Sequence, residues 1–309
     1  MNAFSVTFSN VLLTLFYLLP GWLICRSGKV RPDHMGSTSA ILLYICAPGM
    51  FLNALVSLEP SESLSLQMLA FFGVTMGIQI IFLALLFLLL GKRREDFSSR
   101  IAAIASMMGN VGFFGLPIVR AAFPQAPEAA AYSCIFCATM NILAWTVGVF
   151  VLTGNRKYIS LRAAFVNPTV LSVALGIVLY LTGARNWLPS LAQGGFSTLG
   201  SMTTPLCMFI LGIRLATMSL RQLVSQPATW LAVFGKLVIF PLFSYLLVLP
   251  LPMEPVFKAS VLILSATPCA SIILNLAEIH KNGQELAANC ALLSTLLSVI
   301  TIPLLSLLI

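Results

Sequence analysis

The residues that could bind a ligand lie where an apolar segment is interrupted. The stretch GNVGFFGLPIV, beginning at Gly109, places an asparagine, three glycines and a proline inside a hydrophobic run. Proline removes a backbone donor and clashes with the preceding turn, and glycine lowers the cost of unwinding. A break here creates a half-helix whose free N–H groups attract anions. The pattern therefore predicts an anion site that includes Asn110, Gly112, Gly115 and Pro117.

A second interruption, SATPCAS, lies in a later apolar run and carries Thr267, Pro268 and Ser271. Broken backbone at membrane depth is tolerated where protein or a water-filled cavity satisfies it, so two crossing breaks would support each other. Asn141 and Asn275 could bind the same ligand. They could equally join helices by interhelical hydrogen bonds worth about 0.6 kcal/mol each.

Lys236, in FGKLVIFPL, is the one basic residue placed well inside an apolar run. A charge at that depth costs at least about 2.5 kcal/mol on insertion scales and usually has a function. Lys236 could attract a substrate anion or change protonation during a cycle. Alternatively, its side chain snorkels to a surface about 12 Å away.

The residue types that most enzymes need are in the wrong places. The nine acidic residues lie in loops or at the ends of apolar runs, and the two histidines, His34 and His280, lie in loops. We find no HExxH zinc motif, intramembrane aspartate pair or Ser–His dyad. The sequence predicts no enzyme, no cofactor and no metal site.

The elements that must position these residues are membrane helices. The chain of 309 residues is 59% hydrophobic and 8% charged, with a mean hydropathy of +0.99, whereas soluble domains carry about 25% charged residues. We expect an all-α integral membrane protein with ten transmembrane helices. The expected spans are residues 4–25, 37–57, 67–91, 100–123, 128–153, 167–184, 194–216, 228–250, 256–277 and 284–308.

Basic residues are unevenly distributed over the connections between these spans. Odd-numbered connections and their flanks hold 13 Lys and Arg residues, even-numbered ones hold 3, and Lys236 makes up the total of 17. Because basic residues mark cytoplasmic loops, the odd-numbered connections are expected to face the cytoplasm. Both termini would then lie outside a multi-pass protein of the cell inner (cytoplasmic) membrane.

The spans divide into two repeats of five, residues 1–153 and 154–309. Five is odd, so the second repeat would enter the membrane with opposite polarity. Spans 2 and 7 carry PGMFL and PLCMFI, and spans 4 and 9 each have a proline near the middle. Paired interruptions in inverted halves are typical of a transporter's binding site, although prolines are common in membrane helices and can coincide by chance.

The motif GNVGFFGLP resembles the fourth helix of the auxin efflux carrier family, which includes bacterial malonate and malate permease-like proteins and plant PIN-FORMED carriers. SATPCASIILNLAEIH, GKLVIFPL and MNILAWTVG resemble the ninth, eighth and fifth helices of that family. The resemblance implies a 5+5 inverted repeat in which broken helices 4 and 9 cross. It also implies a scaffold of spans 1, 2, 6 and 7 and a transport unit of spans 3–5 and 8–10. The short connection between spans 5 and 6 makes auxin itself a doubtful substrate.

We expect a secondary transporter of small organic anions, mono- or dicarboxylates, working by alternating access. Two alternatives remain open: a sodium- or proton-coupled symporter of larger amphipathic acids, and a membrane sensor that binds a ligand without moving it. The expected partners are the organic anion and membrane lipid, with no nucleic acid, and a homodimer is one possible assembly.

Overall fold

The computed structural model describes residues 3–309, apart from the side chains of Lys92, Arg94 and Leu220. Every regular element in this range is helical. Seven helical stretches are long and apolar enough to cross a membrane: Ala3–Arg26, Pro32–Val56, Glu62–Leu90, Glu128–Thr153, Ser190–Thr217, Pro227–Val248 and Gln284–Leu308. Three shorter apolar helices cover Val111–Ala122, Pro168–Leu181 and Pro255–Ser265. The prediction of an all-α integral membrane protein is confirmed.

The first half of the chain contains one long uninterrupted helix and several interrupted ones. The long helix, α5, begins where the Ser61 hydroxyl accepts a hydrogen bond from the Leu64 amide, and ends at Gly91, whose φ of 49° suits glycine. The elements are α1 (Ala3–Phe16), α2 (Leu18–Arg26), η1 (Pro32–His34), α3 (Met35–Ile41), η2 (Leu42–Cys46), α4 (Ala47–Val56), α5 (Glu62–Leu90), η3 (Gly91–Glu95), α6 (Phe97–Ala105), η4 (Val111–Gly115), α7 (Leu116–Ala122), α8 (Glu128–Leu143), η5 (Ala144–Gly148) and α9 (Val149–Thr153).

The second half begins with short elements and ends with α20, which keeps its helix through Pro303. Its elements are η6 (Arg156–Tyr158), α10 (Leu161–Phe165), α11 (Pro168–Leu181), α12 (Ala184–Trp187), α13 (Ser190–Ser201), α14 (Thr203–Thr217), α15 (Leu220–Ser225), α16 (Pro227–Phe234), η7 (Gly235–Ile239), α17 (Phe240–Val248), α18 (Pro255–Ser265), α19 (Ile272–Ile279), α20 (Gln284–Leu305) and η8 (Ser306–Leu308).

Four of these elements, η2, η4, η5 and η7, are single wide turns of π-helix. Three of them lie inside longer helices, and η4 begins the helix that continues as α7. A proline follows three of them by two residues: Pro48 after η2, Pro117 after η4 and Pro241 after η7. Proline has no N–H and its ring clashes with the carbonyl four residues earlier, which favours a wider turn just before it. Such turns are frequent at functional sites.

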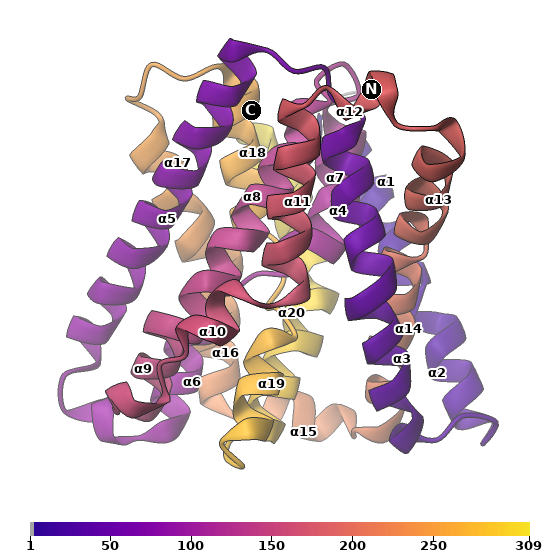
Figure 1. The fold of residues 1–309 in the computed structure, drawn as a ribbon. Coiled ribbons are helices and arrows are strands. Elements are labelled where there is room, and N and C mark those ends of the chain that lie inside the picture. Colours follow the sequence, from indigo (N-terminus) through magenta and orange to yellow (C-terminus); the bar gives the residue numbers. More distant parts are fainter. Residues whose placement is uncertain (1–2) are drawn as a thin grey trace.

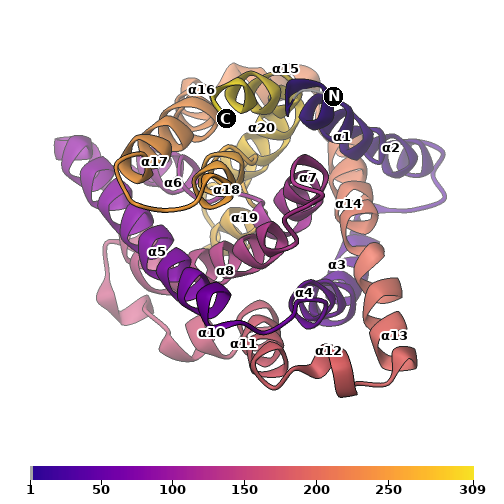
Figure 2. The same ribbon diagram turned by 90° about the horizontal axis from the view of Figure 1, so that it is seen from above.

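Both chain ends lie at one end of the molecule (Figure 1), together with α12 and the connection from α4 to α5. The opposite end carries α15, the end of α19 and the connection from α2 to α3. Seen from the end that holds the termini, α7, α8, α18 and α19 lie toward the middle, while α2, α5 and α13 lie at the periphery (Figure 2).

Two kinds of close packing hold the helices together. The rings of Phe71, Tyr132 and Phe257 join α5, α8 and α18, with centroids 4.4, 4.8 and 5.5 Å apart. On the other side, α2 and α14 touch through their backbones: a Cβ at Gly212 would lie 2.1 Å from the Leu18 carbonyl oxygen. Small residues at a helix contact permit this approach.

Candidate functional site

Two non-helical segments meet inside the helical body. Residues 106–110 separate α6 from η4, and residues 266–271 separate α18 from α19. Gly109 and Cys269 pair as an isolated antiparallel bridge between them. We call these two segments together the crossover. The structure therefore joins the two interruptions that the sequence singled out.

Two backbone hydrogen bonds hold the crossover. The Asn110 amide donates to the Pro268 carbonyl at 2.7 Å, and the Ala270 amide donates to the Met108 carbonyl at 3.0 Å. The intervening Cys269 amide donates to the Ser294 hydroxyl on α20 at 2.8 Å. These three amides are satisfied by protein, so they are not available to a bound anion.

Neighbouring hydroxyl groups satisfy the carbonyls that the interruptions release. The Ser133 hydroxyl donates to the Val111 carbonyl at 2.8 Å, and the Thr204 hydroxyl donates to the Phe113 carbonyl at 2.7 Å. Phe113 lies four residues before Pro117, so its carbonyl is the one that proline deprives of a helical donor. The sequence thus places a hydroxyl on α14 where the proline on α7 creates a need for one.

Lys236, on η7, is fully buried and lies against the crossover. Its ammonium donates to the Ser265 carbonyl at the end of α18, and it lies 4.8 Å from the centroid of the Phe240 ring. A cation stabilises the partial negative charge at a helix C-terminus and interacts favourably with an aromatic face. The side chain therefore points inward, and the snorkelling alternative does not describe it.

A cavity of about 560 Å³ adjoins the crossover. Its lining also includes the end of α19, an element whose end lies opposite the termini (Figure 1). At the crossover it is lined by residues 109–113 and 270–272, which we call its deep end. Its walls come from α3 and η2, the second half of α14, the beginning of α11, α10, α8, η5 and α19. Toward the outside it reaches Tyr44 and Glu278, whose side chains are exposed.

Some of the residues predicted from the sequence line this cavity and others support it from behind. Asn110, Gly112, Asn141, Ser271 and Asn275 are lining residues, and the Asn141 side chain donates to the Cys137 carbonyl at 2.8 Å. The remaining predicted residues do not line the cavity: Gly115, Pro117, Lys236, Thr267 and Pro268.

The supporting residues pack tightly against one another. A Cβ at Gly115 would lie 2.9 Å from both Leu264 and Thr267 on the other interrupted helix, so Gly115 permits the close approach of α18. Pro117 lies in the first turn of α7, beyond the non-helical segment. The unwound segment ends at Asn110, and Pro117 acts on the wide turn η4, which follows that segment.

The cavity meets the beginning of α19, an eight-residue helix. Ser271 and Ile272 line the cavity, and among the described hydrogen bonds neither amide has a backbone acceptor. Asn110 and Asn275 also line the cavity. This arrangement can accept a carboxylate through helix N–H groups and neutral amide side chains.

Two charged residues of the cavity were not among those predicted from the sequence to bind a ligand. Arg214 on α14 and Glu278 on α19 both line it, with 3.9 Å between a guanidinium nitrogen and a carboxylate oxygen. Arg214 lies near the end of an expected span, where basic residues are typical markers of topology. Its spacing of seven residues from Cys207, which lines the same wall, is the signal that could have identified it.

The described residues, 3–309, contain no group of three or more His, Cys, Asp or Glu side chains that could hold a metal ion. The cavity is lined by apolar, neutral polar and two charged side chains. Its chemistry is suited to binding a polar or anionic molecule.

A family described as membrane transport protein, the auxin efflux carrier family, matches residues 6–306. The chain belongs to this family. The resemblance seen in the sequence motifs is therefore confirmed, and the protein is a membrane transporter rather than an enzyme.

Two relatives span almost the same length. The chain is 27% identical over 303 residues to a protein described as an uncharacterized transporter from Methanocaldococcus jannaschii, covering 95% of this chain and 96% of the relative. It is 26% identical over 295 residues to a protein described as a putative malonate transporter from Rhizobium meliloti, covering 91% and 89%.

Proposed function

We propose that this transporter moves small organic anions, mono- or dicarboxylates, across the cytoplasmic membrane by alternating access. The observation that carries the proposal is the cavity whose deep end meets both the crossover and the beginning of α19. A carboxylate there would accept hydrogen bonds from the Ser271 and Ile272 amides, with the Asn110 side chain close by. The name of the Rhizobium meliloti relative supports this substrate class.

The proposed membrane organisation has ten spans in two inverted repeats, residues 1–153 and 154–309. The seven long apolar stretches and the three shorter apolar helices together supply this number. Interrupted helices 4 and 9 occupy corresponding positions in the two repeats, and their pairing at Gly109 and Cys269 supports the arrangement.

The proposed moving parts are a scaffold of spans 1, 2, 6 and 7 and a transport unit of spans 3–5 and 8–10. Contacts within the proposed groups include α2 with α14, α4 with α11 and α13, α5 with α8, and α17 with α18. The groups also touch each other, through α1 with α20 and α7 and through α11 with α8. The cavity is lined by residues of both groups, among them residues of α14 and η2 of the scaffold and of α8 and α19 of the transport unit. Sliding of the transport unit would carry the site toward the other end.

The cavity extends toward the end that carries the odd-numbered connections, which we propose is cytoplasmic because those connections hold most of the Lys and Arg residues. Both termini would then lie outside. In this orientation the structure represents an inward-facing state.

Uptake and counterflow in proteoliposomes test the proposal. Purified protein preloaded with unlabelled malonate should accumulate labelled malonate, and the panel should include acetate, succinate and larger amphipathic acids. Flux should be measured with and without sodium and pH gradients to separate a carrier from a coupled symporter. Folded protein that moves none of the acids would refute the proposal, and ligand binding without counterflow would favour a sensor.

A further inference from the structure

The cavity is lined by a positively charged side chain, Arg214, most of whose hydrogen-bond donors are unused among the described residues. The Arg214 side chain is 21% exposed and belongs to the cavity lining. Within residues 3–309, its one described partner is the Glu278 carboxylate, and the shortest nitrogen-to-oxygen distance is 3.9 Å. Charge-assisted hydrogen bonds between such groups are normally about 2.7–2.9 Å long. The pair is therefore in electrostatic contact without a formed hydrogen bond.

A guanidinium carries five N–H donors in a planar arrangement that matches a carboxylate. Placing that charge inside a membrane protein is costly, and such residues usually face a water-filled cavity and serve a function. Glu278 is a weak structural anchor for it, because 54% of the Glu278 side chain is exposed.

Helices α14 and α19 each line the cavity with residues from one face. On α14, Cys207, Leu211 and Arg214 are spaced four and three residues apart, and all line it. The Asn110 side-chain nitrogen lies 3.8 Å from the Cys207 sulfur, which places Cys207 at the deep end. Arg214 is two helical turns farther out, about 10 Å along the axis. Its side chain leans toward the N-terminus of α14, which shortens the distance to the deep end.

On α19, Ser271, Asn275 and Glu278 follow the same spacing. A polar stripe thus leads from the beginning of the helix to the carboxylate that faces Arg214. A molecule with one carboxylate at the deep end would extend toward the guanidinium along this stripe. A second carboxylate on that molecule would meet Arg214 in competition with Glu278.

We propose that Arg214 binds a carboxylate of the transported anion and selects dicarboxylates over monocarboxylates, with Glu278 as the internal carboxylate that the substrate displaces. This inference rests on the proposed transport of carboxylates. It assigns the cavity two anion subsites, a deep one formed by neutral donors and an outer one formed by a cation.

Malonate and propionate form a matched pair of probes, because both have three carbons and propionate has a methyl group where malonate has its second carboxylate. Binding to purified protein is measured by calorimetry, and KM is measured in proteoliposomes. Arg214→Gln should weaken malonate binding by about tenfold to a hundredfold, the loss expected for hydrogen bonds to a charged group. Propionate affinity should change less than threefold.

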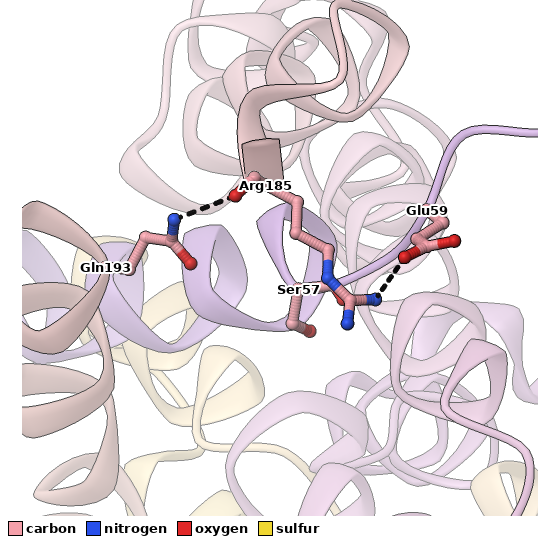
Figure 3. Close-up of polar contacts among 4 residues, drawn as sticks. All are labelled: Ser57, Glu59, Arg185 and Gln193. Carbon is pink, nitrogen blue, oxygen red and sulfur yellow. Dashed lines mark hydrogen bonds and ion pairs between the residues drawn. The ribbon is translucent and has the colours of Figure 1, made fainter. Parts of the chain in front are cut away.

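The chain offers a matched control at its other end. Arg185 on α12 forms an ion pair with Glu59 at 3.4 Å and donates to the Ser57 carbonyl, and its own carbonyl accepts from Gln193 (Figure 3). It does not line the cavity. Arg185→Gln removes the same charge from the same kind of pair and should leave malonate binding unchanged.

Glu278→Gln should tighten malonate binding severalfold, because it removes the competitor. This gain should disappear in the Arg214→Gln, Glu278→Gln double variant. Arg214→Lys keeps the charge without the planar pair of donors, so it should lose part of the malonate affinity. This variant also controls for a folding defect in Arg214→Gln.

Two results would overturn the inference while leaving the proposed function intact: unchanged malonate affinity in Arg214→Gln, or equal weakening by Glu278→Gln and Arg214→Gln, which would mark a structural ion pair. Wild-type protein that neither binds nor moves any carboxylate would instead refute the proposed function, and the inference with it.

Discussion

The backbone crossing at Gly109 leaves no room for a side chain. A Cβ at this position would lie 2.5 Å from the Thr267 hydroxyl oxygen and 2.9 Å from the Lys236 ammonium nitrogen. The lysine end could move, but the Thr267 hydroxyl is short and is held by its 2.7 Å hydrogen bond to the Leu264 carbonyl. Gly109→Ala must therefore separate the two interrupted helices or distort the bridge between them.

The expected loss of stability is about 1–3 kcal/mol, the usual cost of overpacking a well-packed core. Opening the bridge also weakens the hydrogen bond from the Asn110 amide to the Pro268 carbonyl, worth about 1 kcal/mol net. Because Asn110 lines the cavity, transport should fall more steeply than stability. Gly73 on α5 has open space around its Cβ position, so Gly73→Ala should be neutral or stabilising, by up to about 1 kcal/mol.

The assay combines thermal unfolding in detergent with malonate counterflow for wild type, Gly109→Ala and Gly73→Ala. A double variant tests the cause. Thr267→Ala removes the atom nearest the new methyl group, so Gly109→Ala with Thr267→Ala should recover part of the lost stability, with a coupling of at least about 0.5 kcal/mol. Wild-type stability and flux in Gly109→Ala would contradict the steric reasoning, and absence of coupling would show that Thr267 is not the obstacle.

Three further outcomes are expected. Lys236→Met should destabilise the protein by about 1–3 kcal/mol, because the Ser265 carbonyl loses its buried donor. Lys236→Arg should retain more stability in the same thermal unfolding assay. Equal melting temperatures for wild type and both variants would exclude a structural role for Lys236. Thr204→Val should cost about 1–3 kcal/mol by leaving the Phe113 carbonyl unpaired, measured as unfolding midpoint, and a neutral substitution would mean that another donor replaces it. Hydrogen bonds from Ser99 lower the pKa of Asp96 at the beginning of α6. The stabilisation by the Asp96 carboxylate is therefore present above its unfolded pKa of about 3.9 and is lost as the pH falls through the folded pKa. The difference in melting temperature between wild type and Asp96→Ala should shrink as the pH is lowered from 6 to 3, and a constant difference would contradict this linkage.

The class of the protein and the position of its interruptions follow from local sequence. Hydropathy is a property of each segment, and Gly109 and Pro268 disturb the helices in which they lie, so neither needs knowledge of the rest of the chain. The prediction that both interruptions belong to one site rested on the proposed symmetry of two halves. The structure agrees, because Gly109 pairs with Cys269.

The partners of these groups could not be read in the same way, because they come from distant helices. The Thr204 hydroxyl reaches Phe113 from 91 residues away, and the Ser294 hydroxyl reaches the Cys269 amide from a third helix. These contacts decide which backbone donors remain available, so the sequence could predict a broken helix but not which of its amides face the cavity. For the same reason the sequence could not separate Gly115, which packs on α18, from Gly112, which lines the cavity.

The two cations near the site show why depth in the membrane is a poor guide to function. Lys236 attracts attention because it lies mid-span, yet its charge is committed to the Ser265 carbonyl and the Phe240 ring, away from the cavity lining. Arg214 lies near the end of its span and looks like an ordinary topological residue, yet it lines the cavity and faces a loosely held carboxylate. What distinguishes a binding cation from a structural one is the number of donors left unused where the ligand can reach them. By that measure Arg214 is the better candidate for contact with substrate, and Lys236 is the better candidate for holding the crossover in place.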